Sequence, residues 1–410
     1  MIADLMGNPM KTPQSRMADF SRAAIAGVYL TEQGDLSHIP REKLYWQAVT
    51  GSLDDAGLTL AEVDGWVGEP PAGVGLREKM PGAALADLLG HPLRFEATTH
   101  IGAASGSACV GLAALAIANG LADVVVVATS ASGQAQTGYL SADRAKVVEH
   151  MAKLGSPYEW LWGTTRVADY AVIARRHMHE YGTTSDQLAE IAVAQRHGAT
   201  LHPLSVMGRR GEITVDDVLN SRMIADPLHL LDSCIINQGG GAIVVARADV
   251  VRDAGRHAPV VIAGWGEGHG YLDPNSAATL TAFAGREAAD TAFSIAGVTR
   301  DEIDVVGMSD HFTINVLIGL EDAGFCAKGE GGQLVDKGGL AIGGTLPTNT
   351  AGGFMSFSHA GSCGIYTMIE VVQQLRHDAG PRQVAGARLG YTHGMGGVFQ
   401  AHYGAVLARA

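Results

Sequence analysis

A run of small apolar residues, Ile101–Ala118, constrains the fold of this chain more than any other segment. The run is nearly long enough to span a membrane, but Ala, Gly and Ser dominate it, and polar residues follow directly at 119–123. These features predict a buried helix over Gly106–Asn119 instead of a membrane span. The β-branched run Asp123–Ala128 that comes next is typical of a strand buried on both faces.

The strands and helices expected around this helix predict an α/β protein made of two similar halves. The first half is expected to hold strands at Ala23–Tyr29, Val63–Val67, Arg94–Thr99 and Asp123–Ala128, and a helix at Pro40–Gly57. Buried strands follow at Gly239–Ala246 and Val260–Trp265. The second half is expected to hold a strand at Val305–Met308, helices at His311–Ala323 and Ile365–Leu375, and strands at Gly386–Tyr391 and Phe399–Leu407. The shared order of elements predicts an internal repeat.

A longer, more charged and helix-rich segment interrupts the first half. Its clearest helical patterns are Val167–Tyr181 and Ser185–Gln195. We interpret it as an insertion that lies over the sheet. The predicted organisation is therefore a tail over residues 1–22, a first half over 23–250 with the insertion at about 130–230, and a second half over 251–410.

Charge and cysteine usage narrow the class of protein. A formal net charge of −13 argues against nucleic acid and against an anionic membrane surface as partners. The four cysteines, Cys109, Cys234, Cys326 and Cys363, form no CxxC pair and lie in apolar or glycine-rich contexts. Buried thiols are expected from this pattern, with no disulfide framework and no metal site. Met1–Arg22 is polar and mixed, unlike a signal peptide, so a cytoplasmic protein is expected.

Four segments rich in glycine and polar residues could carry chemistry. Each is a loop or strand end that leads into a helix or a hairpin, where backbone N–H groups can hold carbonyl oxygens. These segments are His100–Gly106, Ser309–Thr313, Pro347–Gly361 and Tyr391–Gly397.

The motifs in these segments resemble the thiolase superfamily. Asn349-x-x-Gly352-Gly353, followed six residues later by His359, resembles the thiolase segment that ends in the catalytic histidine. The resemblance runs from about Ala23 to the C-terminus, and it implies a five-layer αβαβα sandwich, usually a dimer, that acts on acyl-CoA thioesters without a cofactor. Further segments are similar to the sterol-carrier-protein-type branch: Ser221–Leu228 with Asp232, Phe325–Gly331, Leu346–Asn349, Gln374–Arg376 and His393–Gly397.

The nucleophilic cysteine of the family is absent. The resemblance places it at Ala103, and alanine cannot form a thioester. Cys109 lies more than a turn further along the helix, so its thiol is expected to point elsewhere, and Cys363 is expected to serve packing. Steroid side-chain aldolases also lack this cysteine, and they resemble the chain at Asp310–Thr313 and Pro347–Thr350. Retro-aldol cleavage needs no acyl-enzyme.

Those aldolases carry tyrosines where this chain has Ser309 and His359, so the match to them is partial. His359 precedes a helix N-terminus, which favours a neutral imidazole, and it is the predicted base. His393 is the predicted second acid or base, or alternatively a hydrogen-bonded turn residue. His311 could orient a substrate oxygen, or it could be an early helix residue capped by Ser309 or Asp310.

The remaining site predictions concern backbone groups and substrate contacts. Asn349 is expected to hold a turn, or alternatively to be a catalytic residue, and Ser309 and Asp310 are expected to contact substrate. The resemblance implies an oxyanion hole from the N–H groups of Ala103 and Gly396. The arginines of the insertion are candidates for the CoA phosphates, because residues 141–222 carry ten Lys and Arg against ten Asp and Glu. They are Arg166, Arg175, Arg176, Arg196, Arg209 and Arg210.

Three functions remain open from the sequence. The first is a cysteine-free lyase that cleaves or forms a C–C bond next to an acyl-CoA thioester by retro-aldol chemistry. The second is a thiolase or acyltransferase in which Ala103 is an engineered replacement. The third is a non-catalytic subunit that binds acyl-CoA or lipid and supports a partner. The resemblance also implies a homodimer and a small zinc-ribbon/OB-fold partner protein.

Overall fold

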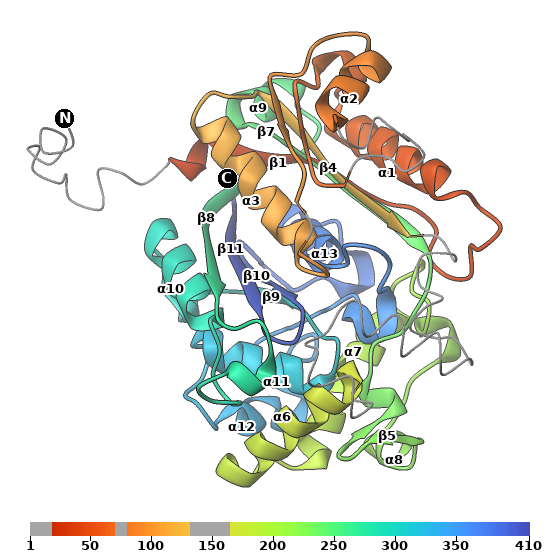
Figure 1. Cartoon of the computed structure of the whole chain (residues 1–410), viewed down its shortest axis with the longest axis vertical. Helices are drawn as coiled ribbons and strands as arrows, with labels where there is room; N and C mark the ends of the chain where they lie inside the picture. Colours follow the sequence, from red (N-terminus) through yellow and green to blue (C-terminus); the bar gives the residue numbers. More distant parts are fainter. Residues whose placement is uncertain (1–18, 70–79, 100, 132–164) are drawn as a thin grey trace, which may run out of the picture.

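A nine-stranded sheet and three layers of helices form the molecule (Figure 1). The computed structural model describes residues 19–69, 80–99, 101–131 and 165–410. The strands of the first half are β1 (Ala23–Leu30), β2 (Gly65–Val67), β3 (Phe95–Ala97), β4 (Val124–Ala131) and β7 (Gly239–Arg247). Those of the second half are β8 (Val260–His269), β9 (Val305–Met308), β10 (Leu389–Gly396) and β11 (Ala401–Arg409).

The sheet has two parts that meet at one short pairing. Its order is β3-β2-β4-β7-β1 and then β8-β11-β10-β9. Only the ends of β1 and β8 pair across the junction, through Ala24 with Val261 and Ile25 with Val260. In the first part β2 is parallel to β3 and β4, and in the second part β9 is parallel to β10. The short junction lets the two parts fold over a shared layer of helices.

The helices complete a five-layer αβαβα sandwich. The middle layer is α3 (Ser105–Ala118) and α13 (Gly364–Arg376), which contact strands of both parts of the sheet (Figure 1). One outer layer holds α1 (Arg41–Ala56) and α9 (Ala248–Ala254), with α2 (Pro81–Leu89) beside β3. The other outer layer holds α10 (Gly285–Ala296) and α11 (Thr313–Ala323). The predicted sandwich of two similar halves is confirmed, because each central helix leads into a strand that is parallel to its neighbour.

Small residues let the central helices approach their neighbours closely. A Cβ added to Gly106 would lie 2.7 Å from the backbone nitrogen of Ile365 in α13. A Cβ added to Gly111 would lie 2.0 Å from the Trp265 ring on β8. The predicted small-residue helix is thus the buried α3, and no helix of the described residues combines the length and apolar character that crossing a bilayer requires.

The predicted insertion is largely helical where the structure describes it. It holds α6 (Arg166–Tyr181), α7 (Ser185–Thr200) and α8 (Val215–Leu219), followed by the hairpin β5 (Met223–Ala225) and β6 (Leu228–His229). These elements lie with α11 and α12 (Gly331–Val335) at the lower end of the molecule in Figure 1. The domain boundaries at residues 22, 230 and 250 stay predictions.

Several predicted elements begin or end elsewhere, and two of these differences affect the candidate site. The helix expected from His311 begins at Thr313, because the Asn315 side chain accepts a hydrogen bond from the Phe312 N–H at 3.0 Å and so defines the helix start. The strand expected to end at Tyr391 continues to Gly396, because its glycines pair along the whole of β11. His311 therefore lies in a loop and His393 in a strand.

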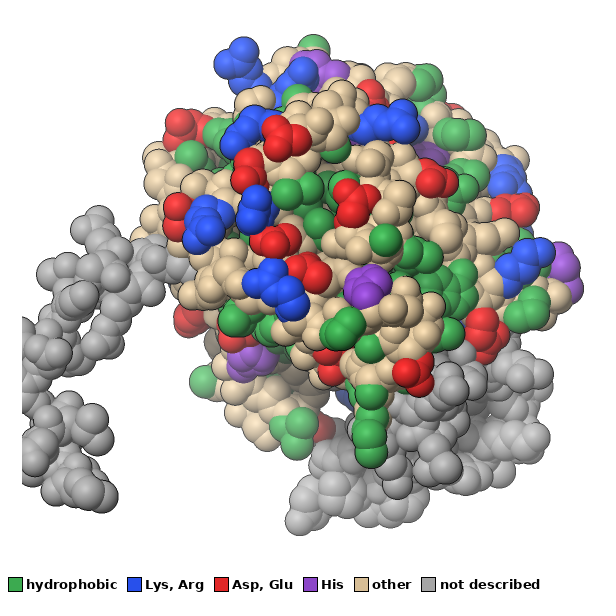
Figure 2. All heavy atoms as spheres, turned by 90° about the horizontal axis from the view of Figure 1, so that it is seen from above, with side chains coloured by type: hydrophobic (Ala, Val, Ile, Leu, Met, Phe, Trp, Pro, Cys, Tyr) green, Lys and Arg blue, Asp and Glu red, His purple; other side chains and the backbone are tan. Residues whose placement is uncertain are grey.

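The surface seen in Figure 2 carries both signs of charge. Lysine and arginine side chains alternate there with aspartate and glutamate, and hydrophobic side chains lie between them. Ion pairs such as Arg94 with Asp64 and Arg247 with Asp249 neutralise part of the charge of the described residues. The described part of this face offers no continuous basic area to a polyanion.

We predict that Gly106→Ala destabilises the protein by about 1–3 kcal/mol, because the added methyl group overpacks the contact between α3 and α13. The measurement is the free energy of unfolding from urea denaturation. Gly82→Ala in α2 is the matched control, because its Cβ would meet only the Glu96 side chain at 3.3 Å or more. Equal effects of the two substitutions would contradict a tight α3–α13 contact.

Candidate active site

Three side chains from distant segments meet beside the N-termini of the central helices. One ring nitrogen each of His311 and His359 and the Cys363 Sγ all lie within 4.8 Å of one another. His311 follows β9, His359 precedes α13, and Cys363 is the N-cap residue of α13. Both imidazoles are half-buried, whereas the thiol is buried. The cluster therefore combines two half-buried bases and one buried thiol within a short distance of one another.

Backbone and amide groups fix the ring of His359. Its Nδ1 lies 3.0 Å from the Ile235 carbonyl, which can only accept, so Nδ1 carries the proton and Nε2 has a free lone pair. The His359 N–H donates to Asn237 Oδ1 at 2.8 Å, and the ring stacks on Phe354 with centroids 5.5 Å apart. Burial lowers the pKa of His359, so the ring is a neutral base.

His311 is held between aromatic rings. Its ring is parallel to that of Tyr170 in α6, with centroids 6.4 Å apart, and it meets His359 edge-on at 5.3 Å. The Tyr170 hydroxyl donates to the Gly397 carbonyl at 2.7 Å. His311 Nδ1 is buried and has no hydrogen-bond partner among the described residues. Burial and the neighbouring His359 lower the pKa of His311 to about 3, so this ring is neutral as well.

Ser309 and Asp310 shape the loop and do not face the cluster as substrate contacts. The buried Asp310 carboxylate accepts hydrogen bonds from the N–H groups of Phe354 and Met355, at 2.8 and 3.1 Å. Ser309 Oγ accepts one from the Met395 N–H at 3.0 Å. This arrangement argues against the predicted substrate-binding role, because backbone N–H groups already donate to these oxygens. Asp310 instead positions the segment that leads to His359.

Ala103, the residue at the position of the missing cysteine, lies next to the start of α13. The Ala103 carbonyl accepts a hydrogen bond from the Gly364 N–H at 3.0 Å, which joins the start of α3 to the start of α13. A Cβ added to Gly396 would lie 3.4 Å from the Ala104 Cβ, so the end of β10 also contacts this turn. Cys109, in contrast, lies in the core, with its Sγ 3.4 Å from a Cβ placed on Gly68. The thiol of Cys109 is therefore no substitute for the one missing at Ala103.

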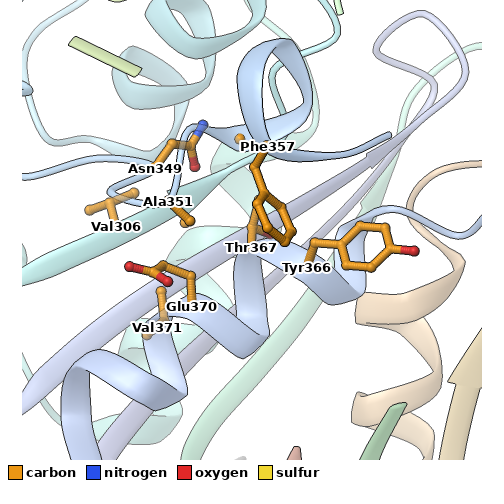
Figure 3. A pocket seen from close by; sticks show the side chains of 10 residues that line it. Val306, Asn349, Ala351, Phe357, Tyr366, Thr367, Glu370 and Val371 are labelled. Carbon is orange, nitrogen blue, oxygen red and sulfur yellow. The ribbon is translucent and has the colours of Figure 1, made fainter. Parts of the chain in front are cut away.

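Asn349 lies in a turn that its side chain ties to the end of β9. It has a φ of 53°, and its amide accepts from the Met308 N–H at 2.8 Å and donates to the Met308 carbonyl at 2.9 Å. Figure 3 shows Asn349 at one side of a small cavity beside α13, with the Tyr366 hydroxyl pointing away from it. Glu370, which also lines the cavity, is paired with Arg382 at 3.0 Å. The polar groups of Asn349 and Glu370 are thus already paired, and we interpret the cavity as part of the core packing and not as a ligand site.

His393 points to the other face of the sheet. Its neighbour Gly394 faces Ser107 and Ala104 of α3, and successive strand residues face opposite ways. His393 Nε2 instead lies 3.0 Å from His402 Nδ1, next to the start of α10. This placement argues against the predicted role of His393 as an acid or base, and the cause is that His393 belongs to β10 and not to a turn.

The arginines predicted to meet CoA lie at different places. Arg166 is one helical turn before Tyr170 on α6, so it lies near the cluster, where it pairs with Asp169 at 3.7 Å. Arg175 forms an ion pair with Asp226 on the exposed side of α6. Arg209 is exposed in a short 3-10 turn, Gly208–Arg210. Of the three, Arg166 is best placed for a ligand at the cluster.

Sequence reasoning missed several residues of the site. Tyr170 and Phe354 pack on the two histidines, and Cys363 joins them although only packing was expected for it. No local signal marks these residues, because their segments meet only in the folded chain. The sequence of the insertion also contains three clustered aromatic residues that could line a substrate tunnel or pack in the core. These residues, Tyr158, Trp160 and Trp162, lie outside the described residues, as does His100.

This chain is similar to several known enzymes. The family description "Thiolase C-terminal domain-like" matches residues 266–409. An acetyl-CoA acetyltransferase of Methanothermobacter thermautotrophicus is 34% identical over 91% of this chain and 96% of its own length. A steroid side-chain-cleaving aldolase of Thermomonospora curvata is 33% identical over 86% and 90%. The solved Ltp2-ChsH2(DUF35) aldolase has a TM-score of 0.83 and 30% identity, covering 96% of this chain and 99% of that chain.

The fold and the site define an α/β enzyme of the thiolase type. The chain belongs to the thiolase superfamily, in the branch that includes sterol-carrier-protein-type thiolases and steroid side-chain aldolases.

The His393–His402 pair predicts a pH-dependent stability. Burial lowers the pKa of His402 to about 4. In the unfolded chain the pKa of a histidine is about 6.5. Between these two pKa values the unfolded chain binds a proton that the folded chain does not. The free energy of unfolding therefore falls as the pH falls, by about 1.4 kcal/mol per pH unit for each such histidine. We expect His402→Asn to reduce this slope by about one proton, measured by urea denaturation from pH 7 to 4. Identical slopes for both proteins would contradict the assignment.

Proposed function

We propose that this protein cleaves β-hydroxyacyl-CoA thioesters by a retro-aldol reaction. As a member of the thiolase superfamily, it is an acyl-CoA C–C lyase or acyltransferase. The observation that carries the finer proposal is the pair of neutral histidines beside Ala103, where the family nucleophile is absent. Two bases without the family nucleophile suit proton transfer better than acyl transfer.

The proposed steps follow from the positions of these groups. His359 Nε2 removes the proton from the β-hydroxyl group while His311 holds that oxygen. The Cα–Cβ bond breaks, the β-carbon leaves as an aldehyde or ketone, and the electron pair passes to the thioester enolate. The N–H groups of Ala103 and Gly396 are the proposed oxyanion hole. The proton then returns from His359 to the α-carbon, so no proton is gained or lost overall.

Substrate and partner proposals rest on the same neighbourhood. Arg166, at the start of α6, is proposed to meet a CoA phosphate, because it lies one turn from Tyr170, which stacks on His311. A homodimer and a small zinc-ribbon/OB-fold partner are proposed from the resemblance, and the Ltp2-ChsH2(DUF35) aldolase supports the partner. The proposed chemistry needs no cofactor, and a cytoplasmic location remains part of the proposal.

The experiment is product analysis with a panel of β-hydroxyacyl-CoA thioesters. We expect release of an aldehyde or ketone and a shortened acyl-CoA, detected by mass spectrometry, with and without the co-expressed neighbouring gene product. His359→Ala should lower kcat/KM by about 100-fold to 10,000-fold, because it removes the general base. His197→Ala is the matched control, since His197 is exposed on α7 and pairs with Glu212. Unchanged turnover in His359→Ala would refute the role of this base.

Intact-protein mass spectrometry separates the lyase from the acyltransferase that the 34% identical acetyl-CoA acetyltransferase suggests. After incubation with acyl-CoA, we expect no covalent acyl adduct, because Ala103 offers no thiol and burial raises the pKa of the Cys363 thiol well above its usual value. An adduct that hydroxylamine removes would favour the acyltransferase. Binding of acyl-CoA without any turnover would favour a non-catalytic subunit.

A further inference from the structure

The cluster at the site has the composition of a metal centre that the family resemblance does not imply. We propose that His311, His359 and Cys363 bind a soft divalent cation, Zn²⁺, as three protein ligands with the fourth position open to a small ligand. Two imidazoles and one thiolate are ligands that Zn²⁺ prefers, and three protein ligands plus one open position are typical of reactive zinc sites.

The geometry needs only a small closure to accept the ion. The three ligand atoms lie within 4.8 Å of one another. Zinc bonds of about 2.0–2.1 Å to nitrogen and about 2.3 Å to sulfur place tetrahedral ligand atoms about 3.5 Å apart, so no pair needs to close by more than about 1.3 Å. Among the described residues, no fourth His, Cys, Asp or Glu joins the group.

The hydrogen bonds around the cluster match those of a zinc-binding histidine. Ligand histidines usually donate their second N–H to a carbonyl or carboxylate, which fixes the ring and its tautomer. The Nδ1–H of His359 does this with the Ile235 carbonyl at 3.0 Å, which leaves Nε2 as the free donor atom. His311 Nδ1 is buried without a partner among the described residues, which is costly unless an ion or ligand meets that ring.

The place of Cys363 in the fold favours a thiolate once a cation is present. Cys363 is the N-cap residue of α13, where the positive end of the helix favours negative charge. Metal ligation requires neutral imidazoles, and the contact of His359 Nδ1 with the Ile235 carbonyl leaves Nε2 free to bind an ion. One thiolate and two neutral rings leave a net positive ion, which would attract an oxygen ligand to the open position.

One part of this inference, the effect of Zn²⁺ on turnover, rests on the proposed function. Zn²⁺ would take the His359 lone pair that the proposed reaction needs, so metal-free protein would be the active form and bound Zn²⁺ an inhibitor. The metal site itself requires no catalytic activity. Binding is therefore measured without acyl-CoA, and turnover is measured on chelator-treated protein, so that each idea can fail alone.

The test is titration of the full-length, chelator-treated protein with Co²⁺ and then with Zn²⁺. We expect one Co²⁺ per chain, with strong visible bands from a four-coordinate ion and a near-ultraviolet thiolate-to-cobalt charge-transfer band, and displacement by one Zn²⁺. Cys363→Ala should abolish the charge-transfer band and weaken binding by at least about 100-fold. His311→Gln, which keeps the thiol, should weaken binding by a similar factor.

Cys326→Ser is the matched control, because Cys326 lies in the loop between α11 and α12, outside the cluster. It should leave the cobalt spectrum unchanged, and circular dichroism and Tm should show that every variant is folded. Absence of a charge-transfer band in the wild-type protein, or a band that persists in Cys363→Ala, would overturn the proposal.

Discussion

The hydrogen bond from the Gly364 N–H to the Ala103 carbonyl joins the N-termini of the two central helices, and the site depends on this junction. It can form only because α3 is made of small residues and Gly106 lets Ile365 approach. The two parts of the sheet then fold over one shared helical layer, and their loops meet at one end of it. A bulkier α3 would keep the strands but separate the segments that carry His311 and His359.

The sequence predicts those parts of the protein that depend on local patterns. The small residues of α3, the β-branched run of β4 and the repeated order of elements were enough to predict the sandwich. The family motifs in the sequence identified Ala103 and His359 as positions of the site. The helix α10 was not anticipated, although Gly285–Ala296 has buried residues at helical spacing and ends at Gly297 as its C-cap.

Contacts between distant segments could not be predicted. His311 and Cys363 meet only because the Asp310 carboxylate ties the β9 loop to the backbone at Phe354 and Met355. The direction of His393 depends on whether Thr392–Gly396 is a turn or a strand, and the pairing with β11 decides that. A single residue of difference in strand register would have turned His393 toward α3.

The proton on His359 is set by a main-chain carbonyl, that of Ile235. Every amino acid supplies the same carbonyl, so substitutions at position 235 can change the neighbouring packing without removing the acceptor. The tautomer of His359 therefore depends on the path of the main chain and not on a neighbouring side chain. Changes in the surrounding sequence can therefore alter the packing around His359 while its Nε2 keeps the lone pair.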